Sequence, residues 1–161
     1  MDLRGISSTD IFIPTGQQSQ LEELANNALS KGIDLYMRQD YEGAIKEFRR
    51  SIGLAPNSSF SVDAASYMAD ANLASEDTEG AIKAYETALR LNPFRDDIHI
   101  SLGNLYFAEE RYEESGKSYE KAVKLRPIAD NHYALGQAYM NTDRYMDAET
   151  QFNNVLRIDP D

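Results

Sequence analysis

The sequence predicts an all-α protein, an α-solenoid in which antiparallel helix pairs stack one after another. The first observation is a set of four prolines, Pro56, Pro93, Pro127 and Pro160, which are 37, 34 and 33 residues apart. The second is that a small residue stands twelve residues before each proline and an aromatic residue eight residues before it. Self-similarity with a period of about 20 to 50 residues is typical of stacked repeats, in which each unit buries its apolar face against its neighbours.

Each repeat unit is predicted to hold two amphipathic helices, because apolar and small residues recur at helical spacing, as in Ala81, Tyr85 and Ala88. Each proline ends the second helix, since its ring displaces the preceding residue from the α region. In chain order, the predicted helices span residues 21–37, 41–54, 62–74, 78–91, 96–108, 112–125, 129–141 and 145–158.

Gly103 and Gly136 fall inside predicted helices, at the same repeat position. A helical glycine costs about 1 kcal/mol relative to alanine, so these positions indicate a place where another backbone passes too close for a Cβ atom. We interpret Gly103 and the small residue Ala81 as packing positions between paired helices.

The repeated columns resemble the tetratricopeptide repeat, whose pattern has small residues at positions 8, 20 and 27, aromatic residues near 11 and at 24, and proline at 32. Position 8 is Gly32, Ala69, Gly103 and Gly136, position 20 is Ala44, Ala81, Ser115 and Ala148, and position 24 is Phe48, Tyr85, Tyr119 and Phe152. The resemblance covers Ala25 to Pro160. It implies a right-handed superhelix of four repeats, about 25–58, 62–95, 96–128 and 129–161, within an array at 21–161 that follows an amino-terminal leader at 1–20.

Repeat two departs from the pattern. Asn72 and Thr78 stand where aromatic residues are preferred, and three extra residues around Ser58, Ser59 and Phe60 lengthen the predicted turn before it. We therefore expect less regular stacking between repeats one and two.

Composition excludes several classes of function. Asp and Glu number 27 against 16 Lys and Arg, which disfavours nucleic acid and anionic membranes as partners. There is no cysteine for disulfides or thiolate metal sites, and no apolar run long enough for membrane insertion. The amino terminus has no charged region followed by an apolar stretch, as a secretory signal would, so we expect a cytoplasmic protein. Catalytic and phosphate-binding motifs are absent, so we expect that it is not an enzyme and has no cofactor. His99 and His132 share repeat position 4, and packing is favoured there over a metal pair.

The resemblance implies that a peptide binds the concave face, which the first helix of each repeat lines. The matching candidates are Leu29, Ile33, Tyr36, Met37, Asp63, Asp70, Leu73, Asp97, Ile100, Asn104, Phe107, Asp130, Tyr133, Gln137 and Met140. Apolar floor residues beneath four aspartates predict a protein or peptide partner with apolar anchors and basic residues. In repeat one the alternative is that Leu29, Ile33 and Tyr36 are buried against a cap or the leader. The cations of the family's carboxylate clamp are missing, so acidic tails should be repelled.

A second hypothesis is a structural unit that assembles with copies of itself. Repeat four lacks a following helix, so we expect Tyr139, Phe152, Val155 and Leu156 to form an exposed apolar edge that either is covered by another subunit or marks truncation of a longer protein. In the leader, the apolar run Ile11 to Ile13 is hypothesised to pack on the array, either in its own groove, in that of a neighbouring copy, or as an outer cap on the first helix.

Overall fold

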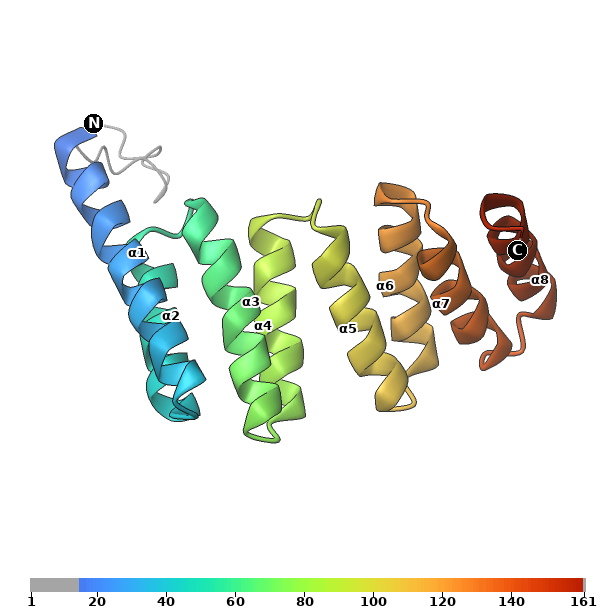
Figure 1. The fold of residues 1–161 in the computed structure, drawn as a ribbon, viewed down its shortest axis with the longest axis horizontal. Helices are drawn as coiled ribbons and strands as arrows, with labels where there is room; N and C mark the ends of the chain where they lie inside the picture. The colour runs from blue at the N-terminus through green and yellow to red at the C-terminus, as the bar shows by residue number, and fades with distance from the viewer. Residues whose placement is uncertain (1–14, 161) are drawn as a thin grey trace, which may run out of the picture.

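The computed structural model describes residues 15–160, which form eight α-helices and no strand. The helices are α1 (Thr15–Met37), α2 (Tyr41–Leu54), α3 (Ser59–Ala74), α4 (Thr78–Leu91), α5 (Asp96–Ala108), α6 (Tyr112–Leu125), α7 (Ala129–Met140) and α8 (Tyr145–Ile158). They stand side by side as four antiparallel pairs in an elongated array (Figure 1). The predicted all-α solenoid is therefore confirmed.

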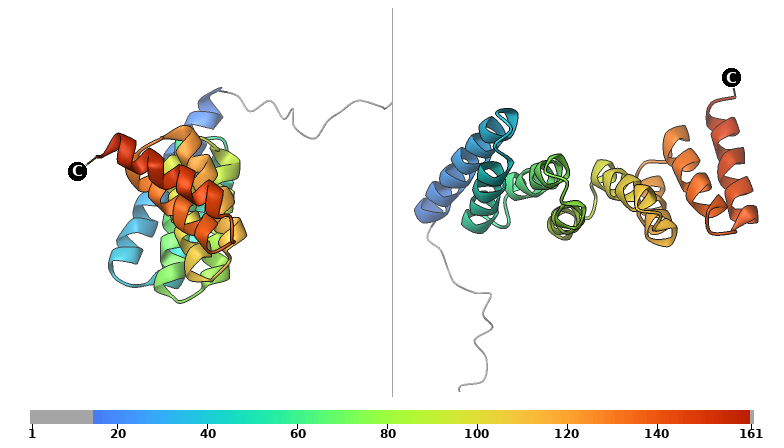
Figure 2. Two further views of the ribbon diagram at one scale, coloured as in Figure 1. Left: turned by 90° about the vertical axis from the view of Figure 1, so that its right-hand side faces the viewer. Right: turned by 90° about the horizontal axis from the view of Figure 1, so that it is seen from below.

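Each helix packs mainly on its neighbours in the chain. The pairs α1/α2, α3/α4, α5/α6 and α7/α8 make up the repeats, and α2/α3, α4/α5 and α6/α7 join them. Viewed along the long axis, the last pair is inclined to the middle pairs, so the array is twisted (Figure 2). Three buried apolar clusters each span a repeat junction, which makes one continuous core.

Two helices begin earlier than predicted. Helix α1 begins at Thr15, because residues 16–20 add helical turns whose exposed side chains give no apolar period to detect. Helix α3 begins at Ser59, so the extra residues form a helical turn instead of a longer loop. Ser58 Oγ and Ser61 Oγ both donate to the Ala55 carbonyl, at 2.8 and 2.6 Å. The hypothesis for Ile11 to Ile13 falls outside the described residues.

The junction between repeats one and two is closely packed. Helix α2 packs more extensively on α3 than α4 packs on α5. The added turn of α3 contributes to this contact, because it places Phe60 against the core cluster of repeat one. The less regular stacking expected at the first junction stays a prediction.

The glycines at repeat position 8 lie against aromatic rings. A Cβ atom would lie 2.5 Å from the Phe48 ring at Gly32, 2.5 Å from the Tyr119 ring at Gly103 and 2.6 Å from the Phe152 ring at Gly136. The expected close neighbour was another backbone, and this detail is wrong: the ring of the paired helix occupies the space. Ala81 is fully buried, in agreement with its interpretation as a packing residue.

The four turns inside the repeats share one backbone geometry. Gln39, Glu76, Glu110 and Asp143 have φ of 64°, 63°, 57° and 58° at the same repeat position. In each turn the backbone N–H of the following residue donates a hydrogen bond to the carbonyl five residues before it, at 2.8 to 2.9 Å. The donor and acceptor pairs are Asp40 and Leu35, Asp77 and Asn72, Arg111 and Tyr106, and Arg144 and Tyr139. Because all four turns are alike, equivalent residues of each repeat occupy equivalent places, and the repeats can be compared position by position.

The ring contact at Gly103 predicts the effect of adding one methyl group. In Gly103→Ala the Tyr119 ring must move, so we expect the free energy of unfolding to fall by about 1–3 kcal/mol. Gly53→Ala is the matched control, since nothing lies within 4 Å of a Cβ atom there. That variant should be unchanged or up to about 1 kcal/mol more stable. Urea denaturation measures both, and parent-like stability of Gly103→Ala would contradict the contact.

Candidate functional site

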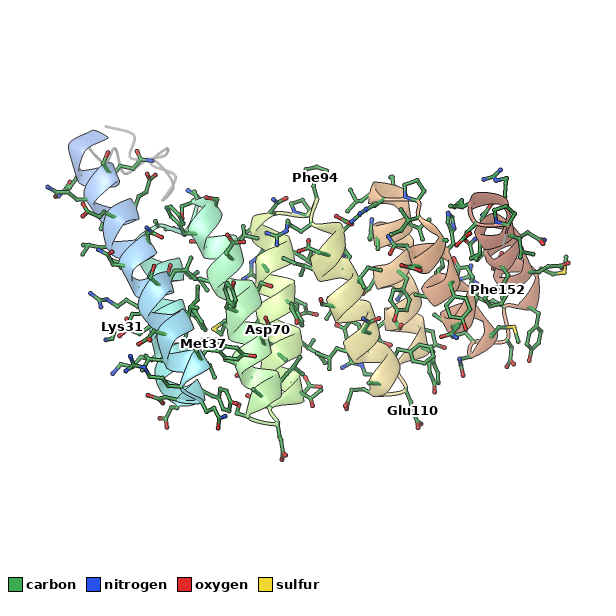
Figure 3. The ribbon with its side chains drawn as sticks, viewed as in Figure 1. Lys31, Met37, Asp70, Phe94, Glu110 and Phe152 are labelled. Carbon is green, nitrogen blue, oxygen red and sulfur yellow. The ribbon has the colours of Figure 1, made fainter. Side chains whose placement is uncertain are left out.

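The candidate residues all lie on α1, α3, α5 and α7, and we call their shared surface the first-helix face. Met37, Leu73, Tyr133 and Met140 are its exposed apolar side chains, with exposed fractions of 75%, 38%, 52% and 46%. Figure 3 labels Met37 and Asp70 on the neighbouring helices α1 and α3. Leu29 belongs mainly to the core, because it packs in the cluster with Phe48 and is only 7% exposed.

Four candidates meet in one cleft between α1 and α3, which we call the α1–α3 cleft. Leu29, Ile33, Asp63 and Asp70 line it together with Ser66, Tyr67 and Arg95, around a volume of about 510 Å³. The Tyr67 ring stacks on Phe48, with centroids 5.9 Å apart and an interplanar angle of 18°. The cleft thus combines aliphatic and aromatic walls with two carboxylates and one cation.

Arg95 neutralises part of the acidic charge expected on this face. Its Nη1 lies 3.1 Å from Asp63 Oδ1, while Nε and Nη2 donate to both carboxylate oxygens of Asp97 at 2.9 and 2.8 Å. The hydrogen bonds from Arg95 lower the pKa of Asp97. Asp70 and Asp130 have no ion pair within the described residues. Two of the four aspartates on this face, Asp70 and Asp130, are therefore without a cation partner among the described residues.

In repeats two and three, the side chain at repeat position 9 is hydrogen-bonded to a tyrosine of the second helix. Tyr85 donates its hydroxyl to Asp70 Oδ1 at 2.7 Å, and Tyr119 donates to Asn104 Oδ1 at 2.7 Å. Burial raises the pKa of Tyr85, and the hydrogen bond with Asp70 adds to the shift. In repeats one and four the ring is phenylalanine, so Ile33 and Gln137 have no such partner.

Aromatic candidates contact rings of the second helix of their own repeat. Tyr36 lies 5.7 Å from Tyr41 between ring centroids, and Phe107 lies 5.1 Å from Tyr112 in an edge-to-face arrangement. These contacts fix the ring directions and leave one side of each half-buried ring toward the first-helix face.

A second set of tyrosines joins neighbouring repeats. Tyr139 donates its hydroxyl to Glu120 Oε1 at 2.7 Å, and the Arg144 guanidinium lies 3.9 Å from the ring centroid. Burial, with the Glu120 hydrogen bond and charge, raises the pKa of Tyr139 to about 12. Tyr106 makes the same contacts with Glu86, at 3.0 Å, and with Arg111, at 4.5 Å, and its pKa is likewise raised to about 12.

The expected apolar edge of repeat four is only partly correct. Tyr139 is buried through its contact with Glu120, and Phe152 and Val155 are half-buried. Leu156 is 62% exposed, and Met146, which sequence reasoning did not select, is 76% exposed. Helix α8 therefore carries an exposed apolar edge that includes the predicted Leu156 and also Met146, which was not predicted.

Neither histidine is placed for metal binding. His99 Nε2 lies 3.1 Å from the Pro93 carbonyl, and buried His132 Nδ1 lies 2.8 Å from Gln151 Oε1. Within residues 15–160 no group of three potential ligands from His, Cys, Asp and Glu is gathered. Over the same range, none of the helices has both the length and the apolar character that crossing a bilayer requires.

The structure defines the class of protein: a twisted helical-repeat array with equivalent turns and a cleft between successive first helices. Two sequence profiles described as tetratricopeptide repeat match the chain, at residues 68–131 and 129–161. The chain belongs to the tetratricopeptide repeat family.

Comparison with known proteins supports the same family. Anaphase-promoting complex subunit 3 of Schizosaccharomyces pombe is 31% identical over 81 residues, half of this chain and 12% of that protein. Human tetratricopeptide repeat protein 6 is 32% identical over 65 residues, 40% of this chain and 12% of that protein. A UDP-N-acetylglucosamine–peptide N-acetylglucosaminyltransferase of Giardia intestinalis is 29% identical over 82 residues, half of this chain and 6% of the enzyme. The chain thus spans only a small part of these relatives.

Solved structures share the fold. A crystal structure of MamA superposes with a TM-score of 0.71 at 20% identity, covering 89% of this chain and 85% of that chain. A tetratricopeptide repeat protein from Parabacteroides merdae superposes with a TM-score of 0.75 at 17% identity, covering 86% of this chain and 54% of that one.

The raised pKa of Tyr139 predicts a loss of stability at high pH. Because the folded state keeps the phenol protonated, its contribution is fully present below the ordinary tyrosine pKa of about 10 and is lost as the pH rises through about 12. We expect the free energy of unfolding of Tyr139→Phe to fall less steeply over this range than that of the parent. Tyr133→Phe, at an exposed tyrosine, should keep the parental slope. Equal slopes in both variants would disprove the role of Tyr139.

Proposed function

We propose that this chain is a non-catalytic protein-interaction module that binds an extended peptide segment of a partner along the first-helix face. The family supports an interaction scaffold. The observation that carries the more specific proposal is the α1–α3 cleft, where four candidate residues meet around an open volume of about 510 Å³. Apolar walls supply contact area there, and the carboxylates supply orientation.

The charges of the cleft favour a partner with one basic residue beside an apolar anchor. Asp70 carries its charge at the cleft without a cation partner, whereas Asp63 is paired with Arg95. A basic side chain would approach Asp70 while the anchor packs against Ile33 and Tyr67. A strongly basic segment would instead meet Arg95, which disfavours it.

An enzymatic role is not part of this proposal. One relative is named as a glycosyltransferase, but the matching segment is only 6% of that protein. A location in the cytoplasm remains a prediction from composition.

Asp70→Asn tests the cleft without disturbing the fold. Repeat three already has Asn104 in this position, where it accepts the Tyr119 hydroxyl, so the asparagine can accept from Tyr85 in the same way. We expect a fluorescein-labelled peptide with one arginine beside one leucine among neutral residues to bind the variant about two- to fivefold more weakly at low salt. Fluorescence anisotropy gives the dissociation constant, and thermal unfolding checks stability.

The control for this experiment is Asp34→Asn, which removes the same charge from an exposed carboxylate of α1 that pairs with Arg38. Its affinity should match that of the parent. Equal weakening in both variants would mean that only net charge matters, and the cleft would be rejected as the binding site.

Self-assembly is the second candidate, and the exposed edge of α8 favours it. Leu156 is 62% exposed, whereas Ile52, Leu89 and Val123 at the same repeat position are half-buried where another repeat follows. The corresponding outer surface of α1 is polar, with Asn27, Lys31 and Asp34 exposed, so a head-to-tail stack of copies would place polar groups against this edge. A contact between two copies of α8 would bury the apolar edge and leave the polar surface of α1 in solvent, so this is the arrangement that we favour.

If α8 joins two copies, Leu156→Glu should shift the protein toward monomer. Light scattering across a concentration series measures the mass, and the exposed position of Leu156 makes unfolding an implausible cause of any change. Phe94→Glu is the control, because Phe94 is 76% exposed on the α4–α5 turn and far from α8 (Figure 3). A parent that is monomeric at every concentration contradicts self-assembly.

A further inference from the structure

A second cleft lies between repeats one and two, on the edge of the array that holds the turns within the repeats. Ile45, Lys46 and Arg49 of α2 form one wall, and Asn72, Ser75 and Asp77 at the end of α3 and its turn form the other. Its volume is about 670 Å³, and it shares no lining residue with the α1–α3 cleft. We call it the edge cleft; Figure 1 shows the α3–α4 turn, which supplies part of its lining, at the lower margin of the array.

The same cleft exists between repeats three and four, where it is largely filled. Lys117 and Glu120 of α6 face Tyr139, Thr142 and Arg144 across a volume of about 290 Å³. These residues hold the same repeat positions as Lys46, Arg49, Asn72, Ser75 and Asp77. The Tyr139 ring lies between the walls, beneath Arg144 and hydrogen-bonded to Glu120.

Three substitutions together open the first junction. Asn72 replaces the tyrosine, Arg49 replaces the glutamate and Asp77 replaces the arginine. The Asn72 amide turns back to its own helix and donates to the Met68 carbonyl at 2.8 Å. Asp77 caps α4 by accepting from the Gly80 N–H at 2.9 Å. The walls of the cleft therefore remain, without the aromatic ring that fills the equivalent space.

The cations of the edge cleft are left without partners. Neither Lys46 nor Arg49 forms an ion pair with any carboxylate in the part of the chain that the structure describes. A guanidinium or ammonium group can stack on an aromatic face, as Arg144 does on Tyr139. Asp40, Glu42 and Asp77 also line the cleft, so an anionic ligand would meet more negative than positive groups. A neutral ring with a polar tip avoids that repulsion.

We propose that the edge cleft receives a tyrosine side chain of a partner protein, in the place that Tyr139 fills between repeats three and four. The ring packs on half-buried Ile45 with the Arg49 guanidinium over its face. The hydroxyl lies within the polar rim, where it donates a hydrogen bond to a carboxylate. This contact adds a second point of recognition that is independent of the first-helix face.

The test is an NMR titration of the labelled protein with N-acetyl-tyrosine amide, with N-acetyl-leucine amide as the probe without a ring. We expect saturable ring-current shifts of the Ile45 methyl groups, the Gly43 amide and the Asn72 side-chain amide with the tyrosine probe alone. Shifts of similar size with the leucine probe, or shifts confined to the first-helix face, would overturn the proposal.

Variants make the test specific. Asn72→Tyr supplies the ring from within the chain and should abolish the shifts, while Lys83→Ala should leave them unchanged, because Lys83 is the counterpart of Lys46 beside the tyrosine-filled second junction. If Asn72→Tyr does not fold, Arg49→Ala is the deciding variant. Its affinity for the tyrosine probe should be about two- to fivefold lower than that of the parent, because the cation–π contact is lost. Shifts that persist in a folded Asn72→Tyr, or parental affinity in Arg49→Ala, would refute the site.

Discussion

The structure depends on one contact repeated along the chain, the packing of an aromatic ring in each second helix onto the small residue at position 8 of the first helix. At Gly103 there is no room for a Cβ atom beside the Tyr119 ring, so the contact sets how closely the two helices approach. Because the ring crosses the first helix at this point, its para position reaches the first-helix face. The hydroxyl of Tyr119 there meets Asn104, which links the core of the repeat to the surface proposed for partner binding.

The junctions between repeats use a second tyrosine, and here the array is uneven. Tyr106 and Tyr139 each bridge to a glutamate of the preceding helix beneath an arginine, while the first junction has Asn72 instead. That junction gains contact at its other end, where the added turn of α3 brings Ser61 to the Ala55 carbonyl. The substitutions in repeat two therefore redistribute packing from one edge to the other, and this explains how an open cleft can coexist with an extensive helix contact.

Most of the fold could be predicted because the same residue types recur at equivalent positions in four repeats. Helix ends near prolines and turns agree with the structure within a residue or two, and Ala81 is buried as expected. The start of α1 could not be found, since its first turns bury no apolar stripe. The sequence did not predict the contact of the Tyr119 ring with Gly103 or the ion pairs of Arg95. These contacts depend on side-chain directions, which are set when the helices pack and cannot be read from the spacing of residues in the sequence.

The candidate site shows why family positions alone do not describe a binding surface. Position 9 was treated as one kind of contact in all four repeats, yet its chemistry follows the residue at position 24. Where that residue is tyrosine, the hydroxyl engages Asp70 or Asn104, whereas phenylalanine leaves Ile33 as an apolar floor and Gln137 without a hydrogen bond among the described residues. A partner that needs an amide contact would find an unengaged one in repeat four, and one that needs an apolar anchor would find it in repeat one. The direction in which a peptide lies on the first-helix face would then follow from residues that belong to the core.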